Sequence, residues 1–181
     1  MIFPSKTITL KNGKSAILRT ASPENAAEML SYIQTASGET DFLSRYPEEW
    51  TLTVEQEAGW LNALASSPYT LAITCFVDGK VAGNCEISFK RGIKEGHRAS
   101  VAIAILQAYW GLGIGSAMFE ELIFAAKEHG TEIIELEYIQ GNDRAKRLYE
   151  KYGFKTVAEK PGVIKLKNGT YLSEFYMQKY L

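Results

Sequence analysis

"AILQAYWGLGIGSAMFEEL", residues 104–122, joins an apolar stretch to an amphipathic one through a loop that contains Gly111, Gly113 and Gly115. The apolar residues after the loop recur at helical spacing, which predicts a helix that ends near Gly130. Because glycine adopts positive φ without steric cost, such a loop can direct several backbone N–H groups and the positive helix end toward one point. The stretch therefore indicates either a phosphate-binding loop or a tight strand-to-helix turn.

Three kinds of phosphate-binding loop have glycines near this spacing. A P-loop needs Lys after its last glycine, whereas Ser116 follows Gly115, so a P-loop is excluded. A dinucleotide loop, G-x-G-x-x-G, needs a further glycine where Ser116 or Met118 stands. An acidic residue does follow about 20 positions later, but one helix and hairpins follow the loop instead of a second βαβ unit. The pyrophosphate of coenzyme A is the third option.

A second motif, NDRAKRLYEKYGF, occupies residues 142–154. Together with WGLGIG at residues 110–115, it resembles the GCN5-related N-acetyltransferase (GNAT) family. That family's loop reads Q/R-x-x-G-x-G/A after a strand, and its later motif reads Asn followed by A-x-x-L/F-Y-x-x-x-G-F. The resemblance is close from Val101 to Phe154, and Trp110 departs from it by standing where the family has Gln or Arg. It implies an N-acetyltransferase that uses acetyl-CoA.

The resemblance also implies which residues bind the coenzyme. The backbone of residues 103–105 would pair with the pantetheine arm as an added strand does, and the loop would hold the pyrophosphate. Asn142 would bond the coenzyme, although its type and place also suit an N-cap of the following helix. Trp110 packs over the coenzyme or fills a surface groove. The implied residues are Ile103, Ala104, Ile105, Trp110, Gly111, Leu112, Gly113, Ile114, Gly115, Ser116, Asn142 and Tyr149.

Tyr149 matches the tyrosine that reaches the coenzyme sulfur in the family and serves there as general acid. By pattern alone it is a core aromatic, because it lies at helical spacing with Ala145, Leu148 and Tyr152. A thiol with a pKa of about 8.5 is a stronger acid than a phenol with a pKa of about 10. We therefore expect Tyr149 to donate a hydrogen bond to the developing thiolate instead of transferring its proton.

The attacking amine needs a base, because an alkylamine with a pKa of about 10.4 is roughly 1 part in 2,500 neutral at pH 7. Glu137 is the first candidate, since some family members place a carboxylate at this strand end. Glu86 and His97 are alternatives, and each carboxylate equally suits a solvated strand position. Relatives often have a glutamate base at the strand position two before Ala102. Ser100 occupies that position here, so a base from this position is disfavoured.

The segment GETDFLSRYPEEW, residues 38–50, is predicted to be a loop that covers the acceptor end of the site. Glu39 and Asp41 would meet a cationic amine there, and Phe42 would form a wall. Cys75 and Cys85 have no nearby His partner, so direct attack in a ternary complex is favoured over an acyl-cysteine. The acceptor is a primary amine of a small molecule, protein or peptide. The alternative is a non-catalytic acyl-CoA sensor with the same loop and Asn142.

The predicted elements follow the order ββ, α, α, βββ, α, β, α, ββ along one domain, residues 1–181. Antiparallel hairpins mixed with crossover helices indicate an α/β (α+β) fold. We expect a GNAT-like mixed, mostly antiparallel sheet of about six to seven strands flanked by about four helices. The hairpin turns are placed at Asn12-Gly13, Asp78-Gly79 and Asn168-Gly169, and a capping box at Thr53 and Gln56 begins the second helix.

Composition and charge exclude several classes of protein. Apolar residues make up 46% and charged residues 23%, with a net charge of −1, which is ordinary globular composition without a footprint for nucleic acid or an anionic membrane. No apolar run approaches the roughly 20 residues that span a bilayer, and the N-terminus does not resemble a signal peptide. Two separated histidines and two cysteines predict no metal site, and a cytoplasmic location is expected. The oligomeric state, a homodimer included, stays open.

Overall fold

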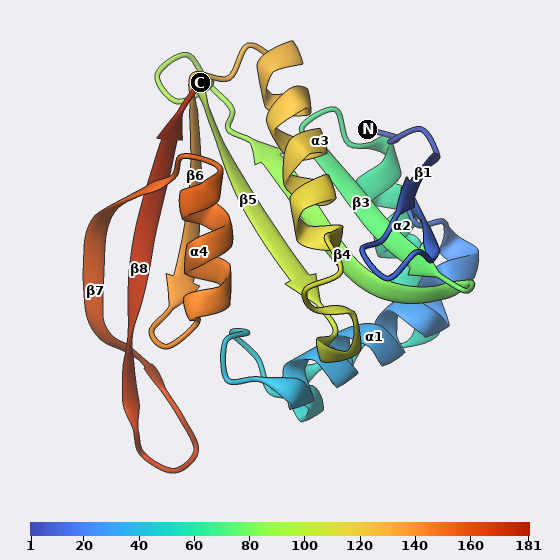
Figure 1. The fold of residues 1–181 in the computed structure, drawn as a ribbon, viewed down its shortest axis with the longest axis horizontal. Helices are drawn as coiled ribbons and strands as arrows, with labels where there is room; N and C mark the ends of the chain where they lie inside the picture. Colours follow the sequence, from blue (N-terminus) through green and yellow to red (C-terminus); the bar gives the residue numbers. More distant parts are fainter.

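A single sheet forms the centre of the computed structural model, which describes residues 1–181. Its eight strands run in the order β1-β2-β3-β4-β5-β6-β8-β7 (Figure 1). All neighbours are antiparallel except β5 and β6. The strands are β1 (Lys6–Thr9), β2 (Ser15–Arg19), β3 (Thr70–Val77), β4 (Lys80–Phe89), β5 (Arg98–Ile105), β6 (Ile133–Ile139), β7 (Lys155–Lys165) and β8 (Tyr171–Tyr180).

Four α-helices accompany the sheet: α1 (Ala26–Glu39), α2 (Val54–Ser66), α3 (Ile114–Glu128) and α4 (Asp143–Lys151). Three short 3-10 helices are η1 (Pro23–Asn25), η2 (Pro47–Glu49) and η3 (Gln107–Tyr109). The mixed, mostly antiparallel fold with four helices confirms the prediction. The sheet has eight strands instead of six to seven, because the N-terminal hairpin joins it through pairing of β2 with β3. None of the helices combines the length and apolar character needed to cross a membrane.

Helices cover both faces of the sheet. Along β4, Cys85, Ile87 and Phe89 face the core under α3 and α4. Asn84 and Glu86 alternate with them and face the side of α1 and α2. The larger core includes Met118, Phe119, Leu122, Ile73, Leu18 and Ile134, and the smaller core includes Met29, Tyr32, Leu61, Phe76 and Val81.

Local sequence patterns determine several element ends. Thr53 Oγ1 accepts from the Gln56 N–H at 3.2 Å, and Gln56 Oε1 accepts from the Thr53 N–H at 2.9 Å, which confirms the capping box. Helix α1 continues to Glu39, so the predicted loop at 38–50 begins inside a helix. Strand β7 extends to Lys165, because pairing with β8 resumes at Ile164 after a register shift.

Strands β5 and β6 separate along their length (Figure 1). They pair only at Arg98–Ile133, Ala99–Ile134 and Ser100–Glu135. Beyond that point β5 stays with β4 and β6 stays with β8, each through an antiparallel ladder. The sheet therefore opens between residues 101–105 and 137–139, and this edge of β5 has no strand partner.

The buried hydroxyl of Tyr32, on α1, bridges β4 and β5 beside this opening. Asn84 and Ala104 face each other in the register. The Asn84 N–H donates to Tyr32 Oη at 3.1 Å, and the Tyr32 hydroxyl donates to the Ala104 carbonyl at 2.8 Å. Burial raises the pKa of Tyr32, so the phenol remains a neutral donor. Tyr32 thereby attaches α1 to the sheet where β5 leaves β6.

Tyr32→Phe should lower the free energy of unfolding by about 1–3 kcal/mol, because a buried N–H and a buried carbonyl would both lose their partner. Urea unfolding followed by circular dichroism measures the change. The control is Tyr180→Phe, whose side chain is 71% exposed and which should change stability by less than about 0.5 kcal/mol. Equal stability of Tyr32→Phe and the wild type would contradict the role of the hydroxyl.

Candidate active site

The opening between β5 and β6 contains a cavity of about 420 Å³. Residues 101–105 of β5 form one wall and residues 137–139 of β6 form the other. The start of α4 and the segment after α1 complete the lining. The cavity thus lies where the β5 backbone has no strand partner, and both faces of the sheet contribute to it.

The glycine loop forms the N-terminus of α3 next to this cavity. Gly113 is the N-cap with φ +99°, and Gly111 has φ +76°, conformations that strain any residue with a β-carbon. A β-carbon on Gly115 would lie 3.0 Å from Leu148 Cδ2, so α3 packs closely against α4 at this glycine. The consecutive N–H groups from Gly111 to Ser116 donate no backbone hydrogen bond. With the helix dipole, they form a site that suits an anion.

Trp110 takes a definite place at the end of β5. Its indole N–H donates to the Ile105 carbonyl at 2.6 Å, which fixes the ring. The Arg144 guanidinium, from the first turn of α4, lies 4.4 Å from the centroid of the Trp110 ring, a cation–π contact. Arg144 takes part in none of the ion pairs of the chain. Both side chains line the cavity, so α4 supplies positive charge next to the glycine loop.

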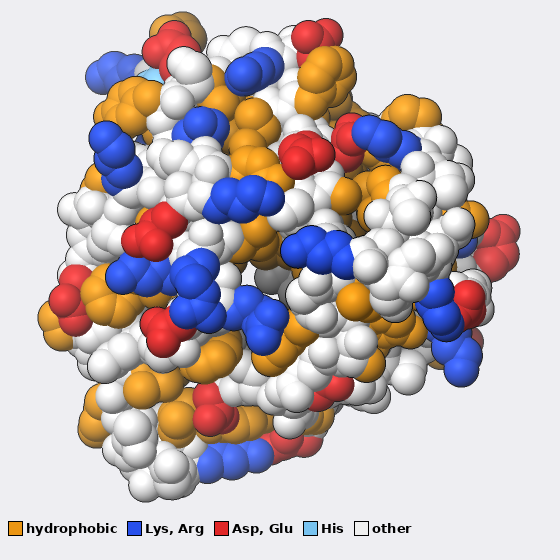
Figure 2. Space-filling view, in the orientation of Figure 1, with side chains coloured by type: hydrophobic (Ala, Val, Ile, Leu, Met, Phe, Trp, Pro, Cys, Tyr) orange, Lys and Arg blue, Asp and Glu red, His pale blue; other side chains and the backbone are white.

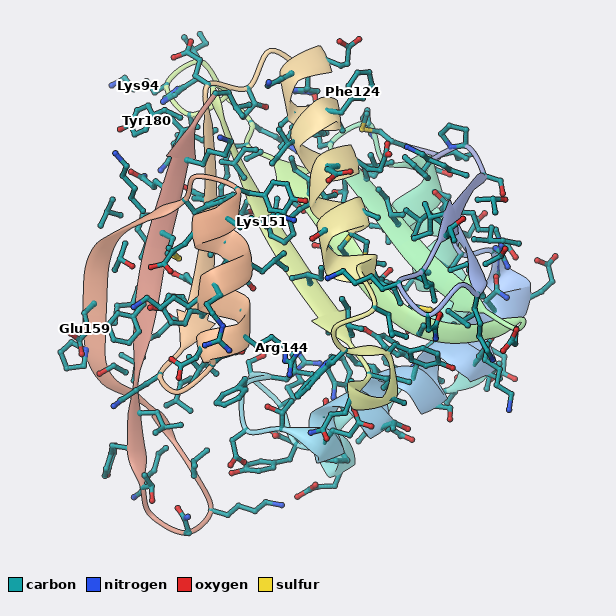
Figure 3. All side chains as sticks on the ribbon, viewed as in Figure 1. Lys94, Phe124, Arg144, Lys151, Glu159 and Tyr180 are labelled. Carbon is teal, nitrogen blue, oxygen red and sulfur yellow. The ribbon has the colours of Figure 1, made fainter.

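Sequence reasoning missed Arg144, although it stands two residues after Asn142 in a helix predicted to border the site. Figure 3 shows it between the start of α4 and the loop that precedes α3. Figure 2 shows Lys and Arg side chains gathered over α4 and around the hollow between α4 and the start of α3. The net charge of the chain conceals this local excess of cations.

Tyr149 combines a packing position with access to the cavity. Its side chain is only 6% exposed, and its ring lies 5.4 Å from the Phe119 ring, as the helical pattern predicts. The only fully buried side-chain polar atom without a hydrogen bond is Thr131 Oγ1. The Tyr149 hydroxyl also has no hydrogen-bond partner in the chain but is not among the fully buried atoms, so it is accessible from the cavity that the residue lines. Burial raises the pKa of Tyr149, which keeps the phenol protonated and able to donate.

Asn142 is the N-cap of α4. Its Oδ1 accepts a hydrogen bond from the Ala145 N–H at 3.2 Å. The residue also lines the cavity, and its side-chain amide can donate there. The capping role is confirmed, and the coenzyme role stays a prediction that this geometry permits.

The candidate bases occupy different places. Glu137 lines the cavity from β6 and is hydrogen-bonded to Lys160. Glu86 lies on β4 opposite Ala102 but is outside the lining, and burial raises the pKa of its carboxyl group. The His97 backbone carbonyl accepts from Glu132 and Ile133, at the paired end of β5 and β6 away from the opening. Glu137 is therefore the candidate that faces the cavity.

The three predicted acceptor residues are not brought together. Phe42 lines the main cavity, where its Cε1 would lie 3.5 Å from a β-carbon on Gly141. Asp41 faces a second cavity of about 290 Å³ between residues 40–49 and 164–167. Glu39 lies outside both linings, because its carboxylate accepts from the Gln107 N–H at 2.7 Å and connects α1 to η3.

Cys75 and Cys85 are buried in β3 and β4, and neither lines the cavity. Burial raises the pKa of Cys75 to about 12 and that of Cys85 well above its usual value. Both thiols therefore stay protonated, which supports the preference for direct attack over an acyl-cysteine. No group of three or more His, Cys, Asp or Glu side chains is arranged to hold a metal ion.

Comparison with known proteins identifies the family to which this fold belongs. The family model described as the Acetyltransferase (GNAT) family matches residues 36–154, more than half of the chain. The crystal structure of a GNAT-family acetyltransferase from Streptococcus pneumoniae is 30% identical, with a TM-score of 0.85, over 92% of this chain and 99% of that chain. The chain therefore belongs to the GNAT family.

Two further relatives concern the cofactor and the reaction. The Salmonella typhimurium acetyltransferase yncA, solved with its cofactor acetyl-CoA, shares the fold with a TM-score of 0.77 at 21% identity, over 92% of this chain and 94% of that chain. An N-alpha-acetyltransferase of Sulfurisphaera tokodaii is 37% identical over 92 residues, which are 45% of this chain and 54% of that protein. The chain thus spans about half the length of this curated relative.

Both cysteine thiols should be inert toward Ellman's reagent at pH 8 in the native protein, because neither is ionised or accessible. In guanidinium chloride both should react, and absorbance of the released thiolate measures this. A thiol that reacts within minutes in the native protein would contradict the burial and restore the acyl-cysteine route.

Proposed function

We propose that the protein transfers the acetyl group of acetyl-CoA to a primary amine by direct attack within a ternary complex. The observation that carries the proposal is one cavity, lined by the open β5 edge, Tyr149 and Glu137, next to a helix start whose N–H groups donate no backbone hydrogen bond. Membership of the GNAT family and the N-alpha-acetyltransferase relative support the same reaction.

Three parts of the site suit the three parts of coenzyme A. The N–H groups of residues 111–116 suit its pyrophosphate, and Arg144 supplies the charge that Trp110 lacks. The open β5 edge at residues 103–105 suits the amide groups of the pantetheine arm, in the manner of an added strand. Asn142 lines the cavity on the opposite side and has an amide that can donate to the arm.

In the proposed reaction the amine nitrogen attacks the thioester carbonyl carbon, so that an N–C bond forms and the C–S bond breaks. The sulfur leaves as a thiolate, and a hydrogen bond from Tyr149 stabilises its charge. The nitrogen loses a proton, which Glu137 accepts directly or through water. A base is useful because deprotonating an alkylamine at pH 7 costs about 4–5 kcal/mol.

A non-catalytic acyl-CoA sensor is the second candidate. The observation that favours it is the hydrogen bond between Glu137 and Lys160, which occupies the carboxylate proposed as base. A sensor would keep the glycine loop and Asn142 and would not need this carboxylate free.

Release of free thiol from acetyl-CoA tests the two candidates. Peptides with a free N-terminus, polyamines, amino acids and aminoglycosides serve as acceptors, and a reaction without amine serves as the control. We expect at least one acceptor to raise thiol release above this control, with the acetylated product seen by mass spectrometry. Calorimetric binding of acetyl-CoA without any amine-dependent release would favour the sensor.

Tyr149→Phe should reduce kcat by about 10²-fold, because the thiolate loses one hydrogen-bond donor. The dissociation constant of coenzyme A should change much less, since the ring and its packing remain. Steady-state kinetics and calorimetry measure the two quantities. The matched control is Tyr171→Phe, whose exposed ring lies outside the cavity and which should keep the wild-type kcat. An unaltered kcat in Tyr149→Phe would leave Tyr149 a packing role only.

A further inference from the structure

The side chain of Lys160 reaches from β7 to two carboxylates of the cavity. Its Nζ donates to Glu137 Oε1 and, at 3.0 Å, to Glu174 Oε2. Glu137 and Glu174 both line the cavity, whereas Lys160 does not. An alkylammonium group therefore lies against the acidic part of the lining and approaches it from outside.

The strand register explains how these groups meet. Strands β6, β8 and β7 are neighbours, and Glu174 of β8 faces Ile139 on one side and Lys160 on the other. Glu137 lies two residues before Ile139 on β6, so it shares a face with Ile139 and is diagonal to Glu174. One ammonium can thus contact a carboxylate from each of two strands.

The ion pairs add little to the stability of the fold. The side chains of Lys160 and Glu137 are 46% and 43% exposed, and exposed ion pairs are screened by water and cost side-chain entropy. Lys160 can therefore leave the two carboxylates at a small free-energy cost. The hydrogen bonds to Glu137 and Glu174 raise the pKa of Lys160, so it remains a cation and is a poor nucleophile in this position.

The group that Lys160 presents is the group that a primary amine acceptor presents. An alkylamine with a pKa of about 10.4 arrives at neutral pH as an ammonium ion. Glu137, the proposed base, is the same carboxylate that holds Lys160. Apolar side chains, among them Phe42 and Leu43, line the cavity as well and suit an alkyl chain.

We propose that Glu137 and Glu174 bind the ammonium group of the acceptor and that Lys160 occupies this site until an acceptor displaces it. The inference rests on the proposed acetyltransferase function and narrows the acceptor to primary alkylamines that bind as cations. Arylamines and alcohols, uncharged at neutral pH, bind poorly because they lack that charge. Once bound, the ammonium gives one proton to Glu137, and the neutral nitrogen attacks the thioester carbonyl carbon. The N–C bond forms as the C–S bond breaks, and the second proton of the nitrogen passes to the leaving thiolate, so that free thiol is released while Glu174 keeps its charge.

Two substitutions with opposite effects test the proposal, with n-pentylamine as the acceptor probe and aniline as its uncharged counterpart. Lys160→Met removes the competitor and should lower KM for n-pentylamine by up to about fivefold, the range of an exposed ion pair. Glu174→Gln weakens the cation site and should raise the same KM at least as much. Lys14→Met, which breaks the exposed Lys14–Asp78 pair of 2.8 Å outside the cavity, should leave KM unchanged. If the ion pairs of Lys160 with Glu137 and Glu174 serve only to join the strands, KM will be unchanged in all three variants, and this result would contradict the proposal.

Calorimetric titration of n-pentylamine into the protein saturated with coenzyme A separates binding from turnover. Lys160→Met should bind the amine more tightly than the wild type, and Glu174→Gln more weakly. Equal affinities, or no binding in any of the proteins, would overturn the inference, and thiol release with other amines would still support the proposed function. The expected shifts without thiol release would overturn the proposed function and leave the cation site standing.

Discussion

The loss of pairing between β5 and β6 after Ser100 is the constraint on which the rest of the site depends. Backbone N–H and C=O groups require partners, and an interior strand normally obtains them from both neighbours. Here side chains provide part of the replacement. The Tyr32 hydroxyl completes the β4 side of β5 at Ala104, and the Trp110 indole satisfies the Ile105 carbonyl at the end of the opening. Trp110 therefore has a structural role at the end of the opening.

The lining of the cavity includes side chains of both charge signs. Arg144 stacks on Trp110, which directly precedes the glycine loop, where unpartnered N–H groups and the α3 dipole also favour an anion. Glu137 and Glu174 form the acidic part of the lining on β6 and β8. In the proposed reaction such a distribution would help to orient an anionic coenzyme and a cationic acceptor before specific contacts form. A net charge of −1 gives no hint of it, because opposite local excesses cancel.

Features encoded within a few residues were predictable from the sequence. The glycine spacing located the start of α3, Thr53 and Gln56 located the start of α2, and the pattern around Tyr149 located its core-facing ring. Features that depend on strand register were not predictable. Lys160 and Glu174 meet only because β7 pairs with β8. Glu39 does not line the cavity, because its carboxylate accepts a hydrogen bond from the Gln107 N–H. Sequence spacing carries no information about which distant strands become neighbours.

The two groups proposed to handle protons are controlled by opposite environments. Burial raises the pKa of Tyr149 and keeps the phenol protonated, so in the proposed reaction it donates a hydrogen bond to the leaving thiolate without transferring its proton. Glu137 is held by a cation that comes from the protein itself. In the proposed arrangement the carboxylate is released only when another ammonium replaces Lys160, so the base becomes available together with the nucleophile. Water lacks the charge needed for that exchange, so under this proposal Glu137 would stay paired with Lys160 and would not assist hydrolysis of the thioester until an amine arrives.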